Sequence, residues 1–88
     1  MKYRVTMKRK VLKTVSKLPK SEQDKLALLV DDLKESGPVQ PGWPNYSKLS
    51  GQEYHCHLSR KWVVCWRHEK ETIVIEVYYA GSRENAPY

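Results

Sequence analysis

The second half of the chain contains the sequence Trp62-Val63-Val64-Cys65-Trp66, then a polar stretch, and then Thr72-Ile73-Val74-Ile75-Glu76-Val77-Tyr78-Tyr79. Nearly all residues of these two runs are β-branched or aromatic, which favours extended backbone. The polar stretch His68-Glu69-Lys70-Glu71 is long enough only for a turn, so we expect the two strands to pair antiparallel. The first run is apolar throughout, which is typical of a strand covered on both faces.

Two further segments alternate between apolar and polar residues. Residues 54–59 alternate Tyr54, Cys56 and Leu58 with polar side chains, and residues 2–7 alternate in the same way. A period of two predicts strands with one buried face. A basic turn, Arg60-Lys61, joins the strand at residues 54–59 to the run that begins at Trp62.

The segment between the first two predicted strands has the period of helices. One apolar face consists of Val11, Leu12, Val15 and Leu18, and a second consists of Leu26, Leu29, Val30 and Leu33. Pro19 separates the two helices, and Gly37-Pro38 ends the second. The connection is so short that the helices must form a hairpin. Residues 38–52 follow as a loop, with Trp43, Tyr46 and Leu49 as apolar anchors.

The predicted element order is therefore β-α-α-β-β-β. It predicts an α+β fold in which an antiparallel sheet carries an N-terminal helical hairpin on one face. Eighty-eight residues are enough for a single domain, residues 1–88, with no room for a second core.

Charge points to an anionic partner. The chain has 16 Lys and Arg against 10 Asp and Glu, a net charge of +6, and residues 1–20 contain no acid. Such an excess favours nucleic acid as the partner, although a solvated helix face would have the same composition.

The sequence contains no apolar run of the roughly 20 residues that are needed to cross a bilayer. Its first residues also lack the apolar core of a signal peptide. We therefore expect a cytoplasmic protein without membrane contact. In that compartment Cys56 and Cys65 are expected to be reduced, buried and structural.

Two histidines could perform proton transfer. If the helices cover the face that carries Cys56, then His55 and His57 share the other face, about 7 Å apart along the strand. Arg60, Lys61 and Arg67 would lie beside them, as would Arg83. Phosphodiester transfer needs such a combination: a base, an acid and cations that stabilise the phosphorane. The same histidines could be ordinary surface residues, or ligands of zinc, although no third and fourth ligand stands at zinc-site spacing.

Four stretches give the chain a resemblance to a known family: Lys48-Leu49-Ser50-Gly51, Tyr54-His55-Cys56-His57-Leu58, the strand from Trp62 to Trp66, and Ala80-Gly81-Ser82-Arg83-Glu84. Together with the element order, they resemble the RelE/ParE superfamily of toxins from bacterial toxin–antitoxin systems. The resemblance implies a toxin that enters the ribosomal A site and cuts mRNA by attack of a 2′-OH on the adjacent phosphate. It implies no metal or other cofactor, and it implies a cognate antitoxin that binds the toxin in a hetero-oligomer.

The resemblance also implies roles for particular residues. His55 and His57 stand where the family has two outward lysines, Arg83 matches the arginine that stabilises the transferring phosphate, and Tyr88 lies near a tail tyrosine that stacks on a base. The expected RNA contacts are Lys48, Arg60, Lys61 and Arg67, together with Lys8, Arg9, Lys10 and Lys13 of the first helix. One departure is that Trp62 or Val63 stands where RelE has an arginine after the hairpin turn.

Two other functions remain open on the sequence. A ParE-like inhibitor of DNA gyrase would have the same fold and would not need the His and Arg side chains. A catalytically inactive relative would bind RNA without cutting it.

Overall fold

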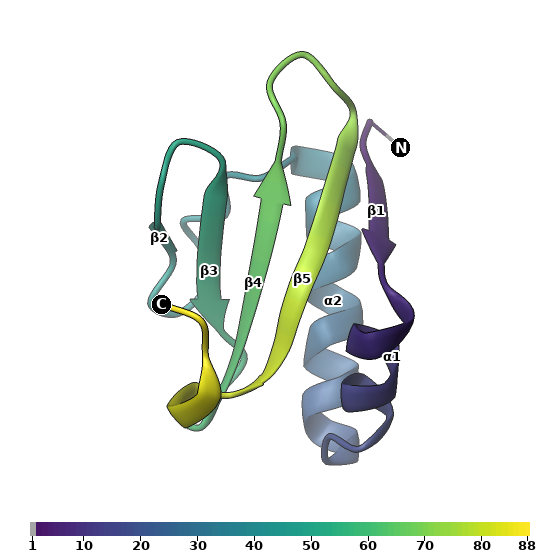
Figure 1. The fold of residues 1–88 in the computed structure, drawn as a ribbon, viewed down its shortest axis with the longest axis vertical. Helices are drawn as coiled ribbons and strands as arrows, with labels where there is room; N and C mark the ends of the chain where they lie inside the picture. The colour runs from purple at the N-terminus through teal and green to yellow at the C-terminus, as the bar shows by residue number, and fades with distance from the viewer. Residues whose placement is uncertain (1) are drawn as a thin grey trace.

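The computed structural model describes residues 2–88 and has the predicted α+β architecture (Figure 1). In chain order the elements are β1 (Arg4–Met7), α1 (Arg9–Ser16), α2 (Lys20–Ser36), β2 (Ser47–Lys48), β3 (Glu53–His57), β4 (Trp62–His68), β5 (Val74–Ser82) and the 3₁₀ turn η1 (Arg83–Asn85). The predicted order is confirmed, and the predicted loop at residues 38–52 contains one additional short strand, β2.

The sheet is mixed rather than antiparallel. Its strand order is β1-β5-β4-β3-β2. Strands β2 to β5 pair antiparallel with their neighbours, whereas β1 pairs parallel with β5, with Val5 opposite Ile75. The expectation of a wholly antiparallel sheet is therefore wrong at this edge. Parallel pairing needs a long connection, and here the helices and three strands of the intervening chain provide it.

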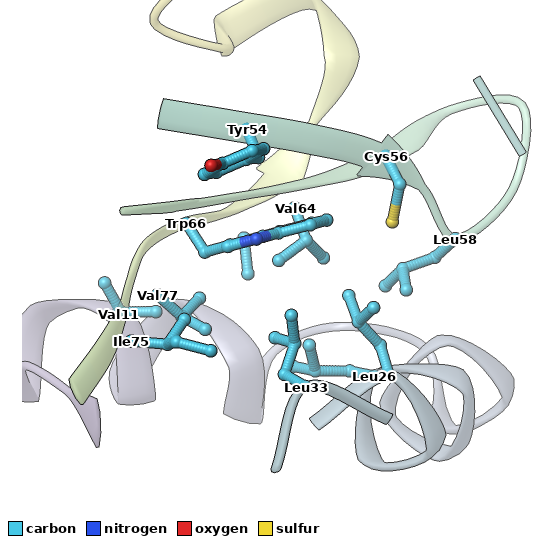
Figure 2. Close-up of a cluster of buried hydrophobic side chains, with 12 residues drawn as sticks. Val11, Leu26, Leu33, Tyr54, Cys56, Leu58, Val64, Trp66, Ile75 and Val77 are labelled. Carbon is cyan, nitrogen blue, oxygen red and sulfur yellow. The ribbon is translucent and has the colours of Figure 1, made fainter. Parts of the chain in front are cut away.

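The hydrophobic core lies between the sheet and the helices (Figure 2). From α2, Leu26, Leu29 and Leu33 are buried, as the predicted stripe requires. From the sheet, Trp66 is fully buried, and its indole Nε1 donates a hydrogen bond to the carbonyl oxygen of Pro38 at 3.0 Å. This bond gives the polar atom of a large core side chain a partner, which offsets the cost of removing the N–H from water.

Helix α1 is less deeply packed than its pattern predicts. Val11 joins the core, but Leu12 is 53% exposed, so its predicted place in the apolar face is wrong. Figure 1 shows the reason: α2 runs behind the sheet alongside β5, whereas α1 lies below β1 at the margin of the sheet. A helix at the margin of a sheet is covered along a narrower stripe than one that lies against its face.

The loop before β2 is anchored as predicted. Trp43 and Tyr46 pack against the core, and Trp43 Nε1 donates a hydrogen bond to Asp32 Oδ2 at 2.8 Å. The ring of Tyr46 stacks on those of Tyr54 and Trp66, with centroids 6.3 Å away in both cases. This anchoring brings β2 into register with β3, so that Ser47 lies opposite His55.

Both cysteines are free and buried, as expected. Cys56 is part of the helix-covered core, whereas Cys65 is paired with His55 on the neighbouring strand and therefore points to the other face of the sheet. Burial raises the pKa of each thiol to about 12. Both are therefore structural side chains that stay protonated at neutral pH.

Candidate functional site

The histidine pair lies on the face of the sheet away from the helices. Tyr54, Cys56 and Leu58 belong to the core, so the alternation of β3 turns His55 and His57 to the opposite side. Their ring centroids are 5.6 Å apart. The prediction that the two histidines share the second face is confirmed.

This face is not open to solvent at the histidines, which corrects the expected exposure. After β5 the chain folds back through η1, and its end lies over the β2–β3 side of the sheet (Figure 1). The Tyr88 ring centroid is 4.4 Å from that of His55. His55 and His57 are only 7% and 8% exposed, while Tyr88 itself is 53% exposed. The residues after β5 thus cover His55, which the alternation of side chains along β3 alone does not predict.

A hydrogen bond fixes the orientation of the His55 ring. Ser47 Oγ lies 2.9 Å from His55 Nδ1. If Nδ1 carries the proton and donates it to Ser47, then Nε2 keeps a free lone pair that can accept a proton. Sequence reasoning missed Ser47, because a strand of two residues gives no periodic signal. Only its pairing with β3 brings it beside the histidine.

Both histidines are poised in their neutral form. Burial lowers the pKa of His55 below its ordinary value, and repulsion from His57 lowers it further, against a smaller opposing effect of the Ser47 backbone. Burial also lowers the pKa of His57, and the positive charge of Arg83 adds to this effect. A neutral imidazole has a lone pair, so at neutral pH each ring is ready to act as a general base.

Arg83 lies in a cationic hollow at the end of the sheet. Its backbone N–H donates a hydrogen bond of 2.7 Å to the carbonyl oxygen of Lys61, which joins the tail to the β3–β4 turn. A hollow of about 420 Å³ is lined by Arg60, Lys61, Trp62, Ser82, Arg83 and Glu84. Within residues 2–88, no acidic side chain forms an ion pair with any of the three cations. Three unpaired positive charges around one hollow are suited to bind a phosphate.

Other predicted RNA contacts lie elsewhere. Lys48 pairs with Tyr54, and its Nζ lies 5.8 Å from the centre of that ring, so it is on the face opposite His55. The reason is the register of β2, in which Ser47 rather than Lys48 shares the face of the histidines.

Arg67 shares the histidine face but is engaged in ion pairs. Its guanidinium lies 2.9 Å from Glu53 and 3.3 Å from Glu76, its cross-strand neighbours on each side. It also covers the ring of Tyr78, 4.6 Å from its centroid. Arg67 therefore stabilises the middle of the sheet, and its charge is largely balanced there.

The basic residues of the first helix are separate from the histidines. Arg9, Lys10 and Lys13 are exposed on α1, and Lys8, which precedes the helix, lies 3.7 Å from Glu76. Of these, Lys10 lines a hollow of about 370 Å³ beside Tyr79 and the tail residue Asn85. The structure therefore places one cationic group at Arg83 and a second one along α1.

Neither a metal cluster nor a membrane helix is evident in the part of the chain that the structure describes. Its His, Cys, Asp and Glu side chains form no group of three or more that could hold a metal ion. None of its helices combines the length and the hydropathy that spanning a bilayer requires.

Solved toxin structures share this fold. RelE of the archaeal RelE–RelB complex from Pyrococcus horikoshii OT3 is 21% identical, with a TM-score of 0.78 over 98% of this chain and 100% of that one. YafQ of the E. coli DinJ–YafQ toxin–antitoxin complex is 14% identical, with a TM-score of 0.76 over all of both chains. The isolated E. coli RelE toxin is 20% identical, with a TM-score of 0.74 over 97% of this chain and 88% of that one.

These likenesses are structural. No protein-family model and no curated protein matches the sequence. At these identities the comparison establishes the fold: this chain folds as the RelE and YafQ toxins do, in agreement with the resemblance seen in its sequence.

Proposed function

We propose that this protein is the toxin of a type II toxin–antitoxin system and an endoribonuclease that cuts mRNA in the ribosomal A site, in the cytoplasm. The observation that carries the proposal is the pair of histidines on one face of the sheet, with the positive charge of Arg83 acting on His57. His55 and His57 are 5.6 Å apart, and the charge of Arg83 reaches His57 strongly enough to lower its pKa. A base, an acid and a phosphate-binding cation are the groups that cleavage by a 2′-OH requires.

The geometry supports a division of roles between the histidines. His55, oriented by Ser47, accepts the proton of the 2′-OH at Nε2 while the oxygen attacks the adjacent phosphorus. Arg83 holds the phosphate, and Arg60 and Lys61 lie around the same hollow. Once a phosphate balances the charge of Arg83, the pKa of His57 rises, so His57 can carry the proton that it gives to the leaving 5′-oxygen. The O2′–P bond forms and the P–O5′ bond breaks, leaving a 2′,3′-cyclic phosphate and a 5′-hydroxyl.

Tyr88 has a place in this scheme as a stacking surface. Its ring contacts His55 and is still 53% exposed, so it can offer a face to the base of the bound nucleotide. In the free chain the same ring covers His55. RNA that enters the site must therefore displace the ring or insert beside it.

An antitoxin partner is part of the proposal. Its support is that structures sharing this fold include complexes named RelE–RelB and DinJ–YafQ. We infer that this chain likewise forms a hetero-oligomer with an antitoxin.

The class of function can be tested by expression in bacteria. We expect the wild-type chain to arrest growth and protein synthesis, and purified chain to cut mRNA that is bound to ribosomes. The products should end in a 2′,3′-cyclic phosphate. If growth arrest occurs without RNA cleavage and a gyrase supercoiling assay is inhibited, the protein is instead a non-enzymatic gyrase toxin. If neither effect occurs with folded protein, it is an inactive RNA-binding relative.

A further inference from the structure

A groove runs along the free edge of β5 and ends in the hollow at Arg83 described above. Strand β1 pairs with β5 only from Val74 to Val77, so residues 78–82 have no strand partner on that side. Three hollows of about 370, 450 and 420 Å³ lie along this part of the strand. Lys10 and Tyr79 line the first hollow. Tyr79, Lys17 and Trp62 line the second. Trp62, Arg60 and Arg83 line the third. Neighbouring hollows share first Tyr79 and then Trp62 as lining residues, so they follow one another along β5, and we call the three together the β5 groove.

Tyr79 is held rigidly in the wall of this groove. Its hydroxyl donates a hydrogen bond of 2.6 Å to the carbonyl oxygen of Ser82. Its ring lies so close to Gly81 that a Cβ there would be 3.0 Å from the hydroxyl oxygen and 3.2 Å from Cζ. The absence of a side chain at Gly81 therefore lets the ring lie against the strand. A partly exposed ring that is already ordered can stack on a base without losing further side-chain freedom.

The charges of the groove have no partner within residues 2–88. Lys10, Lys17 and Arg60 are exposed and form no ion pair with a described acidic side chain. The groove thus combines cations with two partly buried aromatic side chains, Tyr79 and Trp62, while the carboxylate of Glu84 lines it at the Arg83 end. That combination fits single-stranded nucleic acid, whose phosphates need cations and whose unpaired bases need flat surfaces. An acidic peptide would use the cations alone, and a duplex would keep its base faces covered.

We propose that the β5 groove binds the single-stranded RNA that adjoins the scissile phosphate, with Tyr79 and Trp62 as platforms for successive bases. The choice of RNA rests on the proposed function, because the last hollow of the groove is the one where Arg83 would hold that phosphate. RNA emerging from the hollow would pass Trp62, then Tyr79, and reach the basic face of α1. The groove would thereby align the strand and select for nucleotides that are not paired.

The test is binding of a fluorescein-labelled single-stranded 2′-O-methyl RNA, measured by fluorescence anisotropy. This probe has no free 2′-OH and cannot be cut, so binding is read separately from cleavage. We expect Tyr79→Leu to weaken binding at least about fivefold, since a stacked base contributes that much or more. Tyr79→Phe, which keeps the ring, should bind within about twofold of wild type.

Charge variants provide a test that does not disturb packing. Lys17→Ala should weaken binding and reduce the dependence of log K on log salt by about 0.7, the loss of one phosphate contact on a single strand. Lys70→Ala is the matched control, because Lys70 is exposed in the β4–β5 turn, away from the groove, and should leave both quantities unchanged. Melting curves of each variant verify that it is folded.

The outcomes separate the two proposals. If the chain binds the probe through Tyr79 and Lys17 but cuts no RNA, the proposal that the groove binds RNA is supported and the proposed endonuclease activity is overturned. A chain that cuts RNA while Tyr79→Leu and Lys17→Ala bind as wild type overturns the groove alone. Equal competition by a polyglutamate peptide, or equal binding of a duplex of the same sequence, also overturns it.

Discussion

The ring of Tyr88 lies 4.4 Å from the ring of His55, so the last residue of the sequence covers a histidine in the middle of β3. The contact explains why a side chain on the face away from the helices is nonetheless buried, and why its pKa is low. It also links the conformation of the tail to the protonation state of the site.

Removal of the Tyr88 ring should therefore raise the pKa of His55. Burial is the largest cause of its lowered pKa, and Tyr88→Ala exposes the imidazole to water. An NMR titration of the imidazole resonances measures the change. Tyr88→Phe keeps the ring and should leave the pKa near its wild-type value, whereas an unchanged pKa in Tyr88→Ala would show that the tail does not desolvate His55.

Acid should destabilise the fold through both histidines. Their pKa values are lowered in the folded chain and return to about 6.5 on unfolding. Below that value the unfolded chain binds more protons, so the free energy of unfolding falls as the pH falls from about 6.5 through the folded pKa values. Urea denaturation between pH 8 and pH 5 measures this slope. We expect His55→Gln combined with His57→Gln to flatten it, and an equally steep slope in that variant would contradict the account.

The two thiols should be unreactive until the chain unfolds. Burial raises the pKa of Cys56 and Cys65 to about 12, so almost no thiolate exists at pH 8. Ellman's reagent should label neither residue in the native protein and both in urea. Rapid labelling of native protein would show that one of them is accessible.

Trp66 should be the most sensitive position in the core. It is fully buried, stacks on Tyr54 with centroids 6.2 Å apart, and donates its indole N–H to Pro38. We expect Trp66→Ala to lower the free energy of unfolding by about 3–5 kcal/mol, measured by urea denaturation. Trp43→Ala is the comparison, because Trp43 is only half-buried. If Trp43→Ala lowered the free energy of unfolding as much as Trp66→Ala or more, Trp66 would not be the most sensitive position in the core.

Much of the fold follows from local patterns. The stripe of Leu26, Leu29 and Leu33 and the alternation of residues 54–58 determine which faces of α2 and β3 are buried, because periodicity fixes the direction of a side chain once the element is known. The same alternation placed His55 and His57 together on the second face.

The rest depends on pairing between distant segments. The parallel partner of β1 is β5, some 70 residues further along the chain, and no local signal specifies it. The register of β2 turns Lys48 away from the histidines, and the registers on both sides of Arg67 place Glu53 and Glu76 where they balance its charge. Each of these features is a cross-strand relationship, so it becomes visible only when the sheet is assembled.

Cleavage of end-labelled mRNA on programmed ribosomes tests the central claim most directly, with wild type compared with Arg83→Ala and His57→Ala. Arg83 is exposed and His57 lies at the end of β3, and melting curves would verify that both variants fold. We expect wild type to cut within the A-site codon and each variant to be slower by roughly 100-fold or more, the usual effect of removing a proton-transfer or charge-stabilising group. Cleavage within about threefold of wild type in both variants would contradict the assignment of this site.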